Sequence, residues 1–256
     1  MNAKKLLVAL AIKYDGNWEE IYRALIRKDF LIDEEVEKLC RTVKSKVVTI
    51  LDANYPEYLK NYYRPPFVLF YYGDISLLFN PIKNIAVVGT RNPSEKATLT
   101  TRAIVSKVSK EYVVVSGLAR GIDKISHEAA IYSGGKTIGV LGCGIDICYP
   151  SENFDLYQIM KNKHLIISEY CGQSTPDQTH FPQRNRLIAM FSIATFIPEA
   201  TLNSGTSITA NYTEQCNHSI YCLPSGEYVN SLTNSLIRDG AGLVRNADDL
   251  LYDLQK

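Results

Sequence analysis

The sequence lacks the patterns that mark several specialised classes of protein. Its six cysteines contain no CxxC pair, and in a chain of 256 residues they form neither a disulfide framework nor a set of zinc ligands. We therefore expect buried, reduced thiols and no bound metal. No apolar run approaches the roughly 18 residues that a membrane span needs. The run Leu6 to Ile12, which follows two lysines, ends at Lys13 without the cleavage site of a signal peptide. These absences predict a cytoplasmic protein that has no membrane partner.

An excess of charge of either sign is also missing. The chain has 28 Lys and Arg against 27 Asp and Glu, which gives a formal net charge of +1. This balance excludes a surface coated in basic residues, so any nucleic-acid site must be local. Apolar types make up 46% and charged types 21%, which is ordinary for a folded protein and excludes disordered, collagen-like and coiled-coil chains. The length allows one full domain and a smaller one.

Three motifs of common enzyme classes are absent as well. The sequence contains no GxGxxG after its first core strand, no Walker A loop and no GxSxG elbow, which disfavours dinucleotide oxidoreductases, P-loop NTPases and serine hydrolases. His127 follows Asp123 by four residues on one helix face, where we expect a buried histidine that the carboxylate orients. Glu169 and Glu199 end neighbouring predicted strands and could form a carboxylate pair. We predict no catalytic residue and no cofactor.

The pattern of apolar residues divides the chain into three parts. Residues 1–45 carry apolar positions at helical spacing, which predicts a small helical module. Residues 46–83 form a connecting segment that contains proline and one predicted strand, Phe67 to Tyr72. Residues 84–256 alternate short β-branched runs with helical stretches, which predicts a doubly wound, Rossmann-like α/β fold with a mostly parallel sheet. Its strands are expected at 85–88, 113–115, 137–141, 165–167, 193–197 and 219–222, and its helices at 94–109, 122–132, 154–162, 183–191, 205–215 and 246–254.

Small and polar residues gather where these predicted strands end. In an open parallel sheet the ligand lies beyond the carboxyl ends of the strands, where glycines let backbone amides approach an anion. Arginines there supply fork-shaped donors to phosphate, and an aromatic ring beside them suits a single nucleic-acid strand. Because these loops should meet at one edge of the sheet, we predict a phosphate-binding and DNA-binding site there. Its residues are Gly89, Thr90, Arg91, Ser116, Gly117, Arg120, Gly121, Phe181, Arg184, Asn185, Arg186, Ser204, Gly205 and Thr206.

The same loops resemble those of the DNA-processing protein A family, also called Smf. The resemblance extends in the same order over about two thirds of the chain, and the N-terminal helices fit a shortened form of the family's SAM-like module. Two positions depart from the family's pattern: Leu232 stands where a glycine is usual, and Pro198 replaces an aliphatic residue, where it should cost a ladder hydrogen bond. The matching segments are IAVVGTRNPSE from Ile85, VVVSGLARGID from Val113, GGKTIGVLGCGIDICYP from Gly134, ISEY from Ile167, HFPQRNRLIA from His180, EATLNSGTSITA from Glu199 and LIRDGAGLV from Leu236.

The resemblance implies a protein that binds single-stranded DNA, protects it during natural transformation and helps to load the RecA recombinase. It also implies a homodimer without catalytic activity. On the matching positions, the glycine and hydroxyl residues of the predicted site would form an anion cradle. The phosphates would be held by Arg91, Arg120, Arg184 and Arg186.

Two other classes of function stay open at this point. One is a nucleotide N-glycosidase like the cytokinin-activating phosphoribohydrolases, whose PGGxGTxxE loop is related to NSGTSITANYTE here. That reading requires release of free base from a nucleoside monophosphate and loss of activity in Glu199→Gln. The other is a non-catalytic interaction protein whose anion pocket is vestigial.

Overall fold

One mixed sheet forms the centre of the molecule, and its middle part is parallel. The computed structural model describes residues 2–28, 31–226 and 229–255. Within these residues the strand order is β1-β2-β6-β5-β4-β3-β7-β8-β9. The strands are β1 (Lys46–Thr49), β2 (Val68–Gly73), β3 (Asn84–Val87), β4 (Val113–Ser116), β5 (Thr137–Val140), β6 (Leu165–Ser168), β7 (Ala194–Ile197), β8 (Ser219–Cys222) and β9 (Gly242–Leu243).

The sheet reverses its winding direction between β3 and β7. Strands β3, β4, β5 and β6 follow one another outward in one direction, and β7, β8 and β9 follow in the other. Only the β1–β2 and β2–β6 pairs are antiparallel among the described strands. Ile85, Val115, Ile138 and Ile167 in the parallel strands are fully buried, as expected for strands covered on both faces. The predicted Rossmann-like, mostly parallel α/β fold is confirmed.

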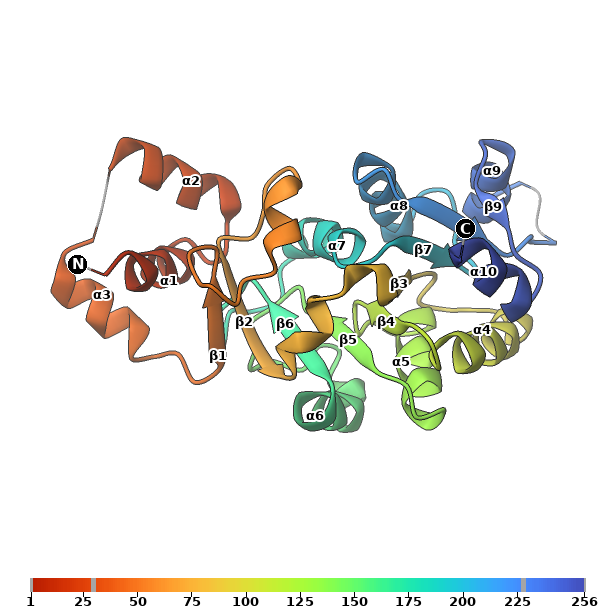
Figure 1. The fold of residues 1–256 in the computed structure, drawn as a ribbon, viewed down its shortest axis with the longest axis horizontal. Helices are drawn as coiled ribbons and strands as arrows, with labels where there is room; N and C mark the ends of the chain where they lie inside the picture. The colour runs from red at the N-terminus through yellow and green to blue at the C-terminus, as the bar shows by residue number, and fades with distance from the viewer. Residues whose placement is uncertain (1, 29–30, 227–228, 256) are drawn as a thin grey trace.

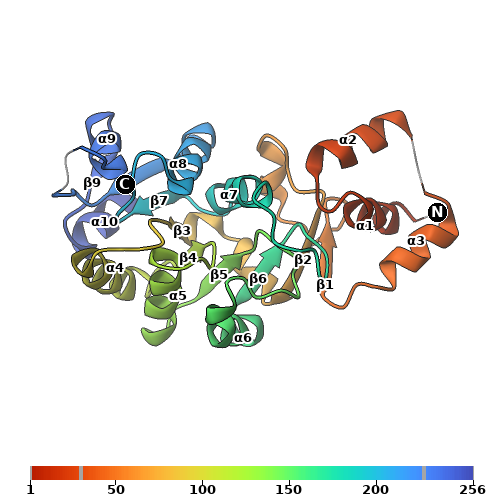
Figure 2. The same cartoon turned by 180° about the vertical axis from the view of Figure 1, so that it is seen from behind.

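Helices cover both faces of the sheet (Figures 1 and 2). One face carries α4 (Glu95–Val108), α5 (Ile122–Tyr132), α6 (Phe154–Lys163) and α10 (Ala247–Leu254), and the other carries α7 (His180–Met190), α8 (Gly205–Gln215) and α9 (Leu232–Arg238). Side-chain caps fix several of the helix starts. The hydroxyl of Ser94 accepts from the Ala97 N–H at the start of α4 (3.1 Å), and Asn246 caps α10. Short 3₁₀ helices span Glu57–Asn61, Ile75–Leu78, Pro81–Lys83 and Ser151–Asn153.

The N-terminal helices lie at one end of the molecule, far from the C-terminus (Figure 1). They are α1 (Ala3–Lys13), α2 (Trp18–Arg27) and α3 (Asp33–Cys40). Residues 6–11 of α1 are all buried, in an apolar cluster that also contains Phe70 of β2 and Ile166 of β6. The predicted limit of the helical module at residue 45 stays a prediction, since these helices share that cluster with the sheet. Among the described residues, no helix is long and apolar enough to cross a membrane.

Several features of the fold differ from the prediction. The segment 46–83 supplies both antiparallel strands at one edge of the sheet, of which β1 was not predicted; α9 and β9 were not predicted either. Pro198 lies one residue beyond the end of β7, and that it costs a ladder hydrogen bond stays a prediction. Leu232 begins α9, where its side chain is buried and its N–H donates to the Ala200 carbonyl oxygen (2.9 Å).

Candidate nucleic-acid interface

A cavity of about 550 Å³, which we call the strand-end cavity, opens at the carboxyl ends of β3 and β7. This is the point where the strand order reverses, and open α/β sheets bind their ligands at such points. The first turns of α7 and α8 complete its wall. Among the predicted site residues, the cavity brings together Gly89, Thr90, Arg91, Phe181, Arg184, Asn185, Ser204, Gly205 and Thr206.

The loop after β3 is held in place by Glu199, two residues after β7. The Thr90 N–H donates to the Glu199 carbonyl oxygen (2.8 Å), and the Ser94 N–H and hydroxyl donate to its carboxylate (3.0 and 2.8 Å). A Cβ on Gly89 would lie 2.8 Å from the same carbonyl oxygen, so only glycine allows this close approach. The idea that Glu199 pairs with Glu169 is wrong, because three strands separate β6 from β7. Its carboxylate instead neutralises the N-terminus of α4.

Arg91 is the cation of this loop that is free to meet a ligand. It is exposed, it borders the strand-end cavity, and its guanidinium lies 5.9 Å from the centre of the Phe181 ring. Within the part of the chain that the structure describes, no carboxylate forms an ion pair with it. An unpaired guanidinium beside an aromatic face can bind a phosphate and leave the ring to a base.

Arg184 lies in the floor of the strand-end cavity, where its guanidinium is bonded to the protein itself. Its guanidinium is buried, and it donates to the carbonyl oxygens of Gly117 (2.7 Å) and Val140, at the ends of β4 and β5. Asp123 lies opposite and accepts from the Gly117 N–H (3.1 Å); burial raises the pKa of its carboxyl, and the charge of Arg184 opposes that rise. Arg184 therefore ties two strand ends together and adds positive charge to the cavity floor. That it also contacts phosphate stays a prediction.

A smaller cavity of about 260 Å³, the side cavity, adjoins the first and contains Gly117 and Arg120. Phe181 and Tyr149 border both cavities, with ring centres 5.7 Å apart, so these two rings form the partition. Arg120 pairs with Glu152 at 2.8 Å, but both side chains are about half exposed, which makes the pair easy to exchange for a phosphate. Tyr149 was not among the predicted site residues, although its position after β5 follows the same strand-end rule.

The N-terminus of α8 forms the opposite wall of the strand-end cavity. Ser204 immediately precedes the helix, and its hydroxyl donates to the Thr201 carbonyl oxygen (2.7 Å), which fixes the turn. Asn185 of α7 donates to the Gly205 carbonyl oxygen (3.2 Å) and so joins the two helices. Ser204, Gly205 and Thr206 all line the cavity. An eleven-residue helix that presents its first turn to a cavity favours an anion there.

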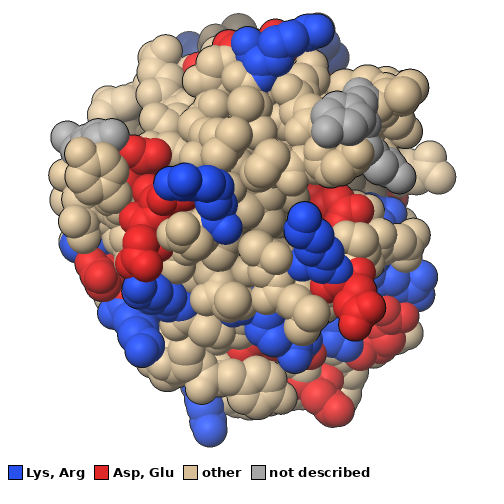
Figure 3. All heavy atoms as spheres, turned by 90° about the vertical axis from the view of Figure 1, so that its right-hand side faces the viewer, with Lys and Arg blue, Asp and Glu red and all other residues tan. Residues whose placement is uncertain are grey.

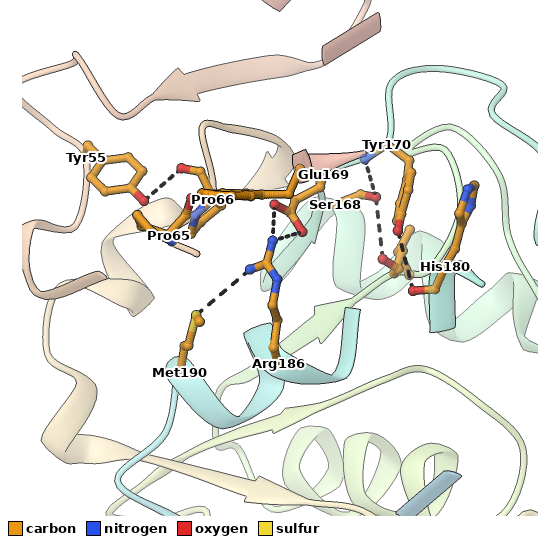
Figure 4. A network of polar contacts seen from close by, with 11 residues as sticks. Tyr55, Pro65, Pro66, Ser168, Glu169, Tyr170, His180, Arg186 and Met190 are labelled. Atoms are coloured by element: carbon orange, nitrogen blue, oxygen red, sulfur yellow. Dashed lines mark hydrogen bonds and ion pairs between the residues drawn. The ribbon is translucent and has the colours of Figure 1, made fainter. Parts of the chain in front are cut away.

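Three predicted residues lie outside both cavities. Arg186 projects from the other side of α7, where its guanidinium holds both carboxylate oxygens of Glu169 at 2.6 and 2.7 Å (Figure 4); the two side chains are 3% and 7% exposed. Ser116 is fully buried and donates to the Val87 carbonyl oxygen (2.6 Å). Gly121, at a φ of 70°, packs against the Thr90 carbonyl oxygen and so supports the backbone of the loop after β3. A phosphate contact by Arg186 stays a prediction, and its placement favours a structural role.

Burial keeps both His127 and Cys143 in their neutral forms. His127 Nδ1 lies 2.6 Å from the Thr137 hydroxyl, so threonine orients the ring, and the expectation that Asp123 does so is wrong. Burial lowers the pKa of His127 to about 3, which keeps the ring neutral. Burial also raises the pKa of Cys143, beside the side cavity, to about 12, so its thiol is a poor nucleophile. The described residues contain no cluster of side chains with the makings of a metal site.

The positive charge of the site is local. Figure 3 shows the end of the molecule beyond α10, where Lys and Arg are interspersed with Asp and Glu. The net charge of +1 leaves no excess to spread over the surface. Within the cavities, by contrast, Arg91, Arg120 and Arg184 converge with a helix N-terminus and two aromatic rings. This arrangement suits a ligand that offers phosphate oxygens and a flat ring.

The fold and the site define the class of protein as a Rossmann-like α/β protein with a cationic, aromatic-walled cavity at the switch point of its sheet. The sequence model of the family described as DNA recombination-mediator protein A matches residues 46–255. The chain belongs to this family, as its strand-end motifs predicted.

Individual relatives agree with this assignment. The chain is 38% identical over 210 residues to the DNA processing protein DprA of Streptococcus pneumoniae, a match that covers 81% of this chain and 73% of the relative. The solved structure of that protein superposes with a TM-score of 0.79 at 36% identity, covering 91% of this chain and 80% of the other. A DNA processing protein A from Helicobacter pylori, whose structure is described in terms of single-stranded DNA binding, gives a TM-score of 0.74 at 30% identity, covering 83% and 97%.

Proposed function

We propose that the chain binds single-stranded DNA in the strand-end and side cavities and acts by binding, without catalysis. The observation that carries this proposal is the convergence of the unpaired Arg91, the first turn of α8 and the Phe181–Tyr149 partition at the switch point of the sheet. Arginine and helix amides suit phosphates, whereas exposed ring faces suit unpaired bases. The single-stranded DNA binding of the related Helicobacter pylori protein supports the same assignment.

The family context extends the proposal. A recombination mediator hands its strand to a recombinase, so we include loading of RecA and action as a homodimer in the cytoplasm. A cavity that binds the strand by a few phosphates and stacked bases, rather than by base-edge hydrogen bonds, would accept any sequence. That property is what a mediator acting on incoming DNA requires.

The N-glycosidase alternative has little support in the site. In the pattern GTxxE the glutamate stands three residues after the threonine, and here that position is the buried Thr209. The carboxylate of Glu199 is already engaged by Ser94. A release assay for free base from nucleoside monophosphates tests this alternative directly: sustained release that Glu199→Gln abolishes would replace the binding proposal.

The proposed function is tested by anisotropy of a labelled oligothymidylate titrated with protein across a series of salt concentrations. Arg91→Ala should weaken binding about tenfold, since a charge-assisted hydrogen bond contributes about 1.5 kcal/mol. The slope of log affinity against log salt should fall by about 0.7, as expected for one lost phosphate contact on a single strand. Arg238→Ala, which removes an 80% exposed side chain on α9, is the matched control and should change neither quantity. If the wild type and Arg91→Ala bind with equal affinity, the strand-end cavity is not the DNA-binding site.

A further inference from the structure

Helix α7 separates the strand-end cavity from a second cavity on its other side. Phe181, Arg184 and Asn185 face the strand-end cavity. His180, Gln183 and Arg186 face a smaller cavity of about 200 Å³, which we call the junction cavity. Its far wall is the loop between α1 and α2, residues 14–17, together with Trp18 at the start of α2, so α7 is the shared wall between the N-terminal helices and the proposed DNA site.

The loop between α1 and α2 sits directly on the start of α7. The His180 ring stacks on Tyr170 with centres 4.0 Å apart and planes 17° apart, and its Nε2 lies 3.7 Å from the Asp15 carboxylate. Gly16, at a φ of 67°, packs so tightly that a Cβ would lie 2.8 Å from both the Glu169 carbonyl oxygen and the Tyr170 ring. A residue with a side chain would push this loop away. The N-terminal helices are therefore fitted against the residue that precedes Phe181.

The Glu169–Arg186 pair anchors α7 from the same side. Figure 4 shows the Arg186 guanidinium rising from α7 to the Glu169 carboxylate at the end of β6, with Tyr170 and His180 beside it. Arg184, two residues earlier, is fixed on the opposite side of the helix by the carbonyl oxygens of Gly117 and Val140. With side chains locked on both sides, α7 cannot turn or slide without disturbing both cavities. Rigid secondary elements and the hydrogen-bond and ion-pair networks that hold them are the parts of a protein that carry coupling between sites.

We infer that Glu169, Arg186 and the loop between α1 and α2 are positioning elements for Phe181, so that DNA affinity is coupled through α7 to the seating of the N-terminal helices. This inference rests on the proposed DNA binding. Coupling between two sites is reciprocal: if the junction sets DNA affinity, DNA binding must also alter the junction. None of these junction residues lines the strand-end or side cavity.

The chain carries a natural reporter at the junction. Trp18 is the single tryptophan of the sequence and lines the junction cavity, outside the strand-end and side cavities. Its ring stacks on Tyr22 and Phe67, each with a centre 5.0 Å away, and its indole N–H donates to the Pro65 carbonyl oxygen (2.8 Å). Pro65 and Phe67 precede β2, so a shift of α2 relative to the sheet changes these two contacts, and with them the tryptophan emission.

The experiment follows Trp18 emission while the full chain is titrated with oligothymidylate, alongside anisotropy of the same labelled strand. The wild type should show a saturable change in Trp18 emission, and the midpoint of that change should coincide with the midpoint of the anisotropy curve. Glu169→Gln should weaken DNA binding about fivefold, a typical size for coupling between sites, and abolish the emission change. Asp15→Asn, at a side chain 57% exposed, carries little risk of unfolding and should reduce both effects in the same direction. Glu34→Gln, an exposed acid on α3, is the matched control and should resemble the wild type.

Each outcome separates the possible explanations. DNA binding without any change in Trp18 emission would overturn the coupling alone, whereas absence of binding would overturn the proposed function with it. A full emission change that persists in Glu169→Gln and Asp15→Asn would mean that DNA touches Trp18 directly, which contradicts transmission through α7. A merely structural role would lower the fraction of active protein but leave the affinity of that fraction unchanged. If Glu169→Gln does not fold, Asp15→Asn decides the question.

Discussion

Gly142 offers a way to move Phe181 without touching it. Gly142 follows β5, and a Cβ there would lie 2.7 and 3.2 Å from two carbons of the Phe181 ring, well inside the ordinary contact distance. The backbone of Gly142 does not have a positive φ, so Gly142→Ala carries no conformational strain of its own. The ring is only half buried, and it should therefore swing outward by about 1 Å or more to restore an ordinary carbon–carbon contact.

Moving the ring should cost DNA affinity more than stability. A base that stacks on an aromatic side chain contributes about 1–3 kcal/mol, so Gly142→Ala should weaken binding of oligothymidylate by about 5-fold to 150-fold. Thermal unfolding of the variant should show a much smaller effect, because the displaced ring moves toward solvent instead of opening a void.

A double-mutant cycle tests the steric explanation. In Phe181→Ala the ring is gone, so adding Gly142→Ala should have no further effect on affinity, which is the signature of two residues that act through one contact. The assay is anisotropy of the labelled strand for the wild type, both single variants and the double variant. Additive losses of affinity in the double variant would contradict the steric explanation, since they would mean that Gly142 and Phe181 affect binding independently.

Three further predictions follow from the described contacts. Arg184→Met should lower the free energy of unfolding by about 3–5 kcal/mol in a denaturant titration, because it leaves two buried carbonyl oxygens without their donor and removes the positive charge that favours the ionised form of buried Asp123; a loss below about 1 kcal/mol would contradict this role. Arg120→Ala should leave the unfolding midpoint unchanged but reduce the slope of log DNA affinity against log salt concentration by about 0.7. An unchanged slope would exclude a phosphate contact by Arg120. Stability should fall as the pH drops below about 6.5, with a slope of up to about 1.4 kcal/mol per pH unit from His127, because the unfolded chain takes up a proton that the folded state refuses until its pKa of about 3. In urea titrations at several pH values, His127→Gln should show a smaller slope of unfolding free energy against pH than the wild type. If the two slopes are equal, groups other than His127 cause the pH dependence.

The central fold was predictable because its strands are short β-branched runs buried on both faces. Runs such as Ile85 to Val88 and Leu165 to Ile167 have no alternative that buries them equally well, and the longer stretches between them must cross the sheet as helices. The sequence patterns of β1 and β9 are too weak to predict a strand. β9 spans only two residues, and β1 forms by antiparallel pairing with β2, a long-range contact that no local sequence pattern encodes.

The candidate site was predictable at its loops but not at every side chain. The strand-end rule located Gly89 to Arg91 and Ser204 to Thr206, since it depends only on where strands end. The strand-end rule does not predict in which direction a helix side chain points, as Arg184 and Arg186 show. Residues two apart on an α-helix point about 200° apart, so both could not face one cavity. The prediction also began α7 at Gln183, whereas it begins at His180, which obscured that geometry.

Competition between single-stranded and duplex DNA in one experiment tests directly whether the two cavities bind a single strand. A labelled oligothymidylate bound to the wild-type chain is displaced with unlabelled single strand, with duplex of the same length and with free mononucleotide. We expect efficient displacement by the single strand, weak displacement by duplex, whose bases cannot reach the Phe181–Tyr149 partition, and little by the mononucleotide. Equal displacement by duplex and single strand, or displacement by the mononucleotide alone, would contradict it.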